Sequence, residues 1–249
     1  MTSFRQHLGL IRSRFLYYRN PLHTRKMIRF YNQFLTAGDL CFDIGTHLGN
    51  RTNAWQKMGA QVISLEPQPQ CLEFLQGKFK NNPAVTIIPK AVSDIRGKTT
   101  LHISSLTPTI STLADQEWQR TIVDKSSFKV EWDQDIEVDV TTLDDLIDEF
   151  GLPKFCKIDV EGLEFNVLLG LSQPVAGLSL EYLSDTASIE AVKCIERIEE
   201  LGSYEFNWSF AESLKLEAED WVRAEQIKEL FAHMKSEDRS GDFYARLVK

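Results

Sequence analysis

The sequence predicts an α/β fold in which helices cover both faces of a mostly parallel sheet. Short apolar runs of strand length recur along the chain, and stretches of helical length separate them. This alternation is typical of parallel sheets, because a helix must carry the chain back over the sheet before the next parallel strand begins. The expected strands are residues 40–45, 61–67, 85–92, 155–162 and 177–182, and the helices between them are 50–58, 68–80 and 163–170.

The first 37 residues are expected to form a basic helical extension of a single domain that spans residues 38–249. Residues 1–38 contain seven arginines and lysines and no acid, although the net charge of the chain is −8. Two apolar sets at helical spacing predict helices that pack on the domain and leave the arginines in water. An arm that contacts an anionic membrane surface is the alternative, and no RNA-binding motif accompanies the charge. The apolar sets are Leu8, Ile11 and Phe15, and Met27, Phe30 and Phe34.

The loop after the first predicted strand suits a small ligand that has no phosphate. Ligands of open parallel sheets bind beyond the carboxyl ends of the strands, and glycines such as Gly45 and Gly49 let a loop approach a ligand closely. A dinucleotide-binding loop would have the pattern GxGxxG, but His47 takes the place of the second glycine. Asp43 would repel a phosphate and attract an ammonium group. We therefore expect Asp43, Gly45, His47, Gly49 and Asn50 to bind a cofactor, with His47 a further candidate base.

Glu66 ends the second predicted strand and adds a second acid to this site. A carboxylate in that position can accept hydrogen bonds from both hydroxyls of a ribose, as it does in dinucleotide-binding folds. Together, Asp43 and Glu66 offer partners for an ammonium group and a ribose. S-adenosylmethionine has both groups and no phosphate, so it fits this site better than a nicotinamide dinucleotide.

Residues 97–134 interrupt the alternation and are expected to form an insertion on the substrate side. The segment is rich in Thr and Ser, with strand-like pieces at 99–103 and 135–141. Long insertions of this kind are often lids or binding loops. Its tryptophans, Trp118 and Trp132, either stack on a sugar ring or anchor the insertion.

The C-terminal part is expected to complete the sheet. The stretch TTLDDLIDEFG predicts a capped helix that ends at Gly151. Strand candidates at 204–210 and 242–248 flank a polar helix at about 219–235. The last strand is expected to enter the sheet antiparallel at its edge.

Six motifs between residues 38 and 183 carry a resemblance to a known family. They are FDIGTHLGNRT (42–52), LEPQPQC (65–71), KAVSDIRG (90–97), STL (111–113), TTLDDLI (141–147) and FCKIDVEGLEFNVLLGL (155–171). With these motifs the chain resembles the FkbM-type S-adenosylmethionine-dependent O-methyltransferases. The resemblance implies a Rossmann-like class I methyltransferase fold, whose seven-stranded, mostly parallel sheet has an antiparallel edge strand. It also implies methyl transfer to a hydroxyl of a small molecule, sugar or secondary metabolite, without identifying the acceptor.

The same motifs suggest roles for further residues. Ala91 and Val92, after the third strand, would lie along the adenine. Asp159 and Glu161 end the fourth strand, and Glu181 ends the fifth. Three converging carboxylates suggest acid–base chemistry, with Asp159 and Glu161 as catalytic candidates, or a hard cation such as Mg²⁺. The alternatives are that Asp159 contacts the cofactor and that Glu161 caps the helix that follows. The histidines show no metal-binding spacing.

Composition favours a cytoplasmic protein, and the family resemblance implies a small-molecule or glycan acceptor. No stretch approaches the roughly 18 apolar residues of a membrane span, and no signal peptide opens the chain. Cys41 and Cys156 fall in expected buried strands, so free thiols in a reducing compartment are expected. A nicotinamide-dependent oxidoreductase and a noncatalytic adenosine-binding protein remain alternative functions. The sequence does not indicate the oligomeric state.

Overall fold

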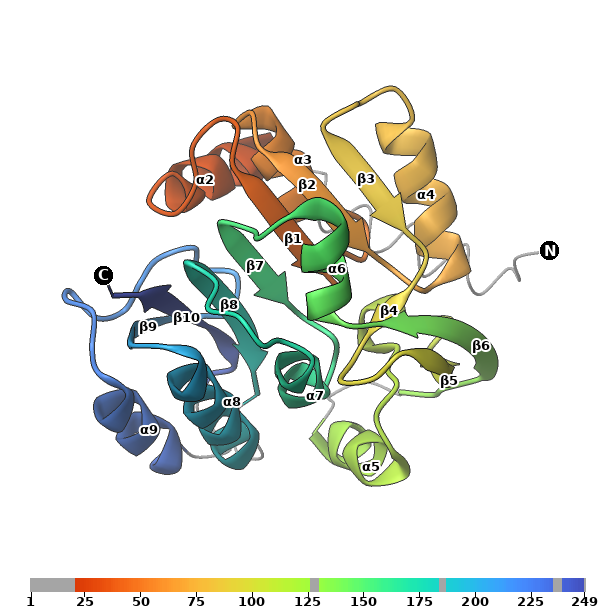
Figure 1. Ribbon diagram of the computed structural model, residues 1–249. Helices are drawn as coiled ribbons and strands as arrows, with labels where there is room; N and C mark the ends of the chain where they lie inside the picture. The colour runs from red at the N-terminus through yellow and green to blue at the C-terminus, as the bar shows by residue number, and fades with distance from the viewer. Residues whose placement is uncertain (1–20, 126–129, 184–186, 235–238, 249) are drawn as a thin grey trace.

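The main sheet has seven strands in the order β3–β2–β1–β7–β8–β10–β9 (Figure 1). The computed structural model describes residues 21–125, 130–183, 187–234 and 239–248. The first five strands in this order are parallel, and β10 runs antiparallel to both β8 and β9. The predicted parallel sheet with an antiparallel pair at its edge is confirmed. The strands are β1 (Leu40–Ile44), β2 (Gln61–Leu65), β3 (Val85–Ile88), β7 (Phe155–Ile158), β8 (Gly177–Tyr182), β9 (Tyr204–Phe210) and β10 (Gly241–Leu247).

Helices cover both faces of this sheet because successive side chains of a strand point to opposite faces. In β1, Phe42 and Ile44 belong to one buried cluster and Cys41 to another. The first cluster includes side chains of α6 (Leu143–Phe150), α7 (Glu164–Leu169), α8 (Ala187–Leu201) and α9 (Ala224–Ala232). The second includes side chains of α2 (Pro21–Tyr31) and α3 (Asn50–Lys57). Helix α4 (Pro69–Phe79) runs beside β3 (Figure 1).

The described part of the basic extension packs on the domain. Met27 and Phe30 are buried, and the ring of Phe34 stacks on Tyr244 of β10 with centroids 5.7 Å apart. The apolar spacing of this segment therefore serves burial, as the sequence predicted. Outside the described residues lies the other predicted set, Leu8, Ile11 and Phe15.

The predicted strand at 85–92 is wrong as one element, because the structure divides it into β3 and β4 (Ala91–Val92). Pro89 lies between them, and proline has no N–H with which to continue a ladder. Strand β4 belongs to a second sheet of order β4–β6–β5, with β5 (Gly97–Ile103) and β6 (Gln134–Thr141). Between β5 and β6 the insertion contains a 3₁₀ turn (Pro108–Ile110) and helix α5 (Gln116–Lys125).

Local signals account for most helix ends. The Thr142 hydroxyl accepts from the Asp145 N–H at 3.1 Å, and α6 ends before Gly151 at φ +96°, as expected from the sequence. Helix α9 begins later than expected because Val222 pairs with Phe206 of β9.

Among the described residues, no helix is long and apolar enough to cross a membrane. The four cysteines of the chain are buried free thiols, as predicted.

Candidate active site

One cavity opens at the carboxyl ends of β1, β2, β7 and β8, where parallel sheets bind ligands. It contains about 1020 Å³ of empty space, including the part open to solvent. Strand β4 and the insertion between β5 and β6 form its remaining wall. The cavity brings together all but one of the predicted site residues. Those that line it are Asp43, Gly45, His47, Asn50, Glu66, Ala91, Val92, Asp159 and Glu161.

Gly49 is the predicted site residue that does not line the cavity. It precedes α3 at φ +72°, and a side chain there would meet Leu75 and Phe79 of α4. Its glycine is needed for helix packing, and the sequence could not show which way this position faces. Asp94 of the KAVSDIRG motif also lies outside the cavity lining.

Gly45 brings two loops of the cavity into contact. It has φ +77°, and a Cβ built there would collide with the backbone carbonyl of Asp159. The sequence interpretation assigned this glycine to close approach of a ligand. Gly45 does line the cavity, and its missing side chain also lets the β1–α3 loop approach the β7–α7 turn closely.

Asp43 lies at the floor of the cavity, 2% exposed. Its Oδ2 accepts from the Thr46 hydroxyl at 2.6 Å and from the N–H and hydroxyl of Thr52 at 3.1 and 2.5 Å. Three donors on one oxygen hold the carboxylate in place. Among the described residues, Oδ1 has no such donor, which leaves it for a ligand ammonium.

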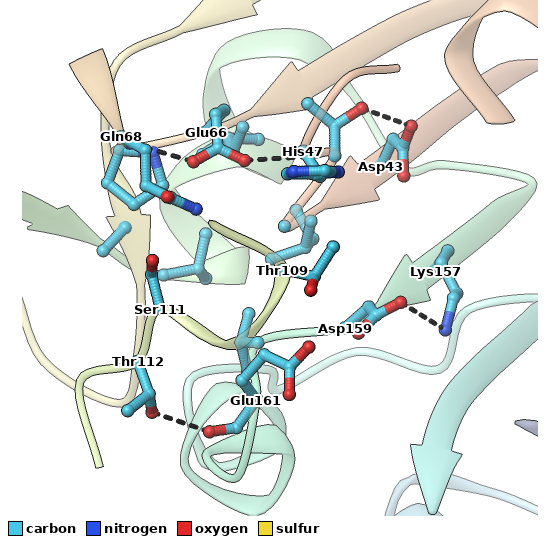
Figure 2. Close-up of a pocket in the computed structure, with 18 of the residues that line it drawn as sticks. Asp43, His47, Glu66, Gln68, Thr109, Ser111, Thr112, Lys157, Asp159 and Glu161 are labelled. Carbon is cyan, nitrogen blue, oxygen red and sulfur yellow. Dashed lines mark hydrogen bonds and ion pairs between the residues drawn. The ribbon is translucent and has the colours of Figure 1, made fainter. Parts of the chain in front are cut away.

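Glu66 is held as an acceptor by two backbone donors (Figure 2). Its Oε2 accepts from the His47 N–H at 2.8 Å, and its Oε1 accepts from the Gln68 N–H at 2.9 Å. Each oxygen keeps a lone pair for a ribose hydroxyl. Burial raises the pKa of Glu66 to about 8, although the two N–H groups favour its charged form.

His47 is neutral at physiological pH, because burial lowers its pKa to about 4 against the opposing charge of Asp159. Its backbone adopts φ +49° and directs its N–H to Glu66. This geometry favours a role for His47 in positioning the loop over a role as the base.

Ala91 and Val92 line the cavity, as do Pro108 and Leu113 of the insertion. An apolar lining of this kind suits a flat adenine ring. The side chain of Gln68 binds the insertion, since its Nε2 donates to the Pro108 carbonyl at 3.1 Å. Gln68 belongs to the LEPQPQC motif, but its role depends on a contact 40 residues away.

Three carboxylates meet at the mouth of the cavity, as the strand ends predicted. Oxygens of Asp159, Glu161 and Glu181 all lie within 4.8 Å of one another. Burial, followed by the charge of Asp159, raises the pKa values of Glu161 and Glu181 well above the usual carboxyl range. A carboxylate whose pKa is raised binds a proton more readily than an ordinary carboxylate, as a general base must.

The sequence analysis gave no role to Lys157, which supplies the cation of this cluster. Its buried Nζ lies 2.7 Å from Asp242 Oδ1 and 3.3 Å from Asp159 Oδ2. Burial alone would lower the pKa of Lys157, but Asp159 and Asp242 outweigh it and raise that pKa. A lysine in the apolar strand FCKI was the signal for a buried ion pair, since lysine is almost never fully buried unless paired.

Glu161 does not cap α7, so that alternative is wrong. The N-cap position of α7 is Leu163, which makes no side-chain cap. Glu164, the first residue of the helix, braces the preceding turn, since its Oε1 accepts from the Val160 N–H at 3.0 Å and its Oε2 from the Gly162 N–H at 3.2 Å. Glu161 instead has φ +56° and lines the cavity.

The two tryptophans of the insertion anchor it. Neither Trp118 nor Trp132 lines the cavity, and their rings pack edge to face with centroids 6.3 Å apart. The Trp132 Nε1 donates to the Ile110 carbonyl at 2.9 Å. Of the two alternatives, stacking on an acceptor sugar therefore has no support in this geometry.

One known protein family matches the sequence of this chain. The family model of the methyltransferase FkbM domain matches residues 43–233, a range that includes every residue lining the cavity. No curated protein matches the chain.

Solved structures align over most of the chain at low identity. A precorrin-6Y C5,15-methyltransferase from Geobacter metallireducens is 13% identical, with a TM-score of 0.44 over 90% of this chain and 87% of its own. A TehB-like SAM-dependent methyltransferase from Corynebacterium glutamicum is 10% identical, with a TM-score of 0.43 over 82% and 100%. An O-methyltransferase from Bacillus cereus in complex with SAH is 12% identical, with a TM-score of 0.41 over 92% and 82%.

Proposed function

Because the chain belongs to the FkbM methyltransferase family, we propose that it transfers a methyl group from S-adenosylmethionine to a hydroxyl of a small-molecule or glycan acceptor. The observation that carries this proposal is that one cavity has carboxylates at two different ends. At one end, Glu66 and Asp43 offer fixed carboxylate oxygens. At the other, Asp159 and Glu161 face the open mouth.

The residues present fit S-adenosylmethionine. Glu66 would accept from the ribose hydroxyls, and Ala91 and Val92 would contact the adenine. The Asp43 oxygen that has no donor among the described residues would meet the ammonium group, and Asp159, which also lines the cavity, would contact the methionine end of the cofactor. When bound, the cofactor supplies a methyl group on a sulfonium, which is already a good leaving group.

The protein then has to orient the acceptor and receive its proton. Glu161, or Asp159 beside it, takes the hydroxyl proton as the acceptor oxygen forms the new C–O bond and the C–S bond breaks. Orientation of two reactants can contribute about 7–11 kcal/mol, against roughly 10²- to 10⁴-fold for a general base. Loss of cofactor binding should therefore cost more activity than loss of one carboxylate.

We expect this chemistry to proceed without magnesium. The ammonium of Lys157 already lies 3.3 Å from Asp159 and neutralises part of the acidic cluster. This charge weakens the attraction of the three carboxylates for a divalent cation.

The alternatives make different predictions for ligand binding. A nicotinamide-dependent oxidoreductase would also use the carboxylate of Glu66 to bind a ribose, but the family match favours methyl transfer. Calorimetry is expected to detect S-adenosylhomocysteine binding and no NAD binding. Methyl release on a panel of hydroxylated acceptors, in buffer with EDTA, then separates an enzyme from a noncatalytic binding protein. Binding of NAD in place of S-adenosylhomocysteine would overturn the proposal.

Glu161→Gln is expected to lower kcat about 10²-fold or more, the lower range for a general base, and to leave S-adenosylhomocysteine affinity unchanged. The protonated form of Glu161 cannot accept a proton, and burial raises its pKa. Wild-type kcat should therefore rise with pH as Glu161 ionises, and the variant should lose this rise. Steady-state kinetics across pH checks both, with the exposed Glu137→Gln as the control. Wild-type turnover in Glu161→Gln would remove Glu161 from the mechanism.

A further inference from the structure

We propose that the insertion between β5 and β6 positions Glu161 for proton transfer, with Thr112 and Trp118 as the positioning residues. The proposal rests on the proposed role of Glu161 as a base and adds a new role for the insertion. It also gives a role to Thr112 of the STL motif at residues 111–113.

The turn that carries Glu161 has an unfavourable backbone. Glu161 has φ +56° and the next residue, Gly162, has φ +102°. A non-glycine residue in the left-handed region is strained and persists only where its surroundings hold it. The turn thus needs contacts that keep the Glu161 carboxyl group directed into the cavity.

One side of the turn is held by its own helix. Glu164 accepts from the N–H groups of Val160 and Gly162, as described above. These bonds leave the carbonyl of Glu161 itself to be satisfied from outside the turn.

Thr112 provides this partner from the insertion. Its hydroxyl donates to the Glu161 carbonyl oxygen at 2.7 Å and accepts from the Ala114 N–H at 2.8 Å (Figure 2). The backbone of Thr112 is itself held in place, because it exchanges two hydrogen bonds of 2.9 and 3.0 Å with His102 of β5. A residue bridged to β5 of the second sheet is therefore hydrogen-bonded to the backbone of the candidate base.

Trp118 closes the same turn from the outside. A Cβ built on Gly162 would lie 2.6 Å from Cδ1 of the Trp118 ring, so the ring rests directly on the α-carbon. The ring is supported by Trp132, which is itself bonded to the backbone at Ile110. Outward rotation of the turn would drive Gly162 into this pair of rings.

The contacts from Thr112 and Trp118 both fix the direction of the Glu161 side chain. Figure 2 shows the Glu161 carboxyl group pointing toward Asp159, while its backbone carbonyl points the opposite way to Thr112. The base atom must lie about 2.6–3.2 Å from the oxygen that carries the proton it takes. Loosening the turn should therefore lower kcat and leave the cofactor end of the cavity intact.

Thr112→Val tests the tether, because it keeps the shape of the side chain and removes the hydroxyl. We expect kcat to fall about tenfold to a hundredfold, since a misplacement of about 1 Å can cost on the order of 10²-fold. Affinity for S-adenosylhomocysteine should stay within about twofold, and Thr112→Ser should restore kcat because it restores the donor. The matched control is Thr121→Val in α5, where the hydroxyl also donates to a backbone carbonyl but lies outside the cavity.

A double-mutant cycle with Glu161→Gln separates positioning from an independent effect. If Thr112 acts through Glu161, Thr112→Val should lower kcat little further in the Glu161→Gln background. Equal losses in both backgrounds would overturn the proposal. So would a Thr112→Ser enzyme as slow as Thr112→Val.

Amide hydrogen exchange gives a readout that needs neither acceptor nor turnover. In Thr112→Val, exchange at Gly162 and Leu163 should become faster, while the amides of β1 and β2 keep their wild-type rates. Unchanged exchange at Gly162 would show that Thr112 does not hold the turn. Wild-type turnover in Glu161→Gln would instead show that Glu161 is not the base of the proposed function. The exchange rates would then test by themselves whether Thr112 holds the turn.

Discussion

Replacement of Glu66 by alanine is expected to weaken S-adenosylhomocysteine binding at least about tenfold. The variant loses the acceptor for two ribose hydroxyls, and hydrogen bonds to a charged acceptor contribute about 1.5–3 kcal/mol each. It also leaves the N–H groups of His47 and Gln68 without their partner, which loosens both loops. Titration calorimetry measures the affinity, and circular dichroism checks that the variant folds. Unchanged affinity would remove Glu66 from the cofactor site.

Glu66→Gln adds a pH test of the same contact. The pKa of Glu66 is raised to about 8, so the wild-type side chain is largely protonated at pH 6. Ribose hydroxyls bind its ionised form, so wild-type affinity should rise between pH 6 and pH 8, by up to about tenfold per unit. The Glu66→Gln variant should not show this part of the rise, because glutamine does not titrate. The same slope in both proteins would assign the pH dependence to another group.

Lys157→Met is expected to lower the free energy of unfolding by about 3–5 kcal/mol, the usual cost of breaking a buried ion pair from one side. Methionine fills a similar volume but leaves Asp242 with Arg51 as its remaining charged partner, at 3.3 Å. Asp159 loses its fixed cation at the mouth of the cavity. Urea denaturation with an unchanged m value would measure the loss.

The matched control for this variant is Lys98→Met. Lys98 pairs with Glu137 on the surface, where both side chains are more than half exposed. Water screens such a pair, so the midpoint of unfolding should not change measurably. A Lys157→Met protein as stable as the Lys98→Met protein would show that the buried network contributes nothing to the fold.

The order of strands and helices could be predicted because it depends on local patterns. Apolar runs, the Thr142 cap and the glycine at 151 each act through neighbours within a few residues. The one strand that was predicted wrongly contains Pro89, a local signal that the apolar pattern on either side concealed. Helix α8 was not predicted, although its residues are amphipathic.

The candidate site could be predicted only as far as strand ends determine it. Asp43, Glu66, Asp159 and Glu181 follow or end parallel strands, and parallel strands bring their carboxyl ends to one edge of the sheet. This is why the sequence alone gave the acidic ends of the cavity and the type of cofactor that suits them. Gly49 was misplaced because the direction of a loop residue depends on the helix that packs beside it.

The sequence by itself determined the α/β fold, the family motifs and the carboxylates at the strand ends. Tertiary structure alone decided what holds the acidic mouth of the cavity, because Lys157 and the turn of Glu161 find partners far along the chain. Lys157 meets Asp242 across 85 residues, and Thr112 reaches the Glu161 carbonyl across 49. Such contacts leave no periodic trace in a sequence, since a buried ion pair or hydrogen bond depends on which surfaces fold together rather than on local spacing.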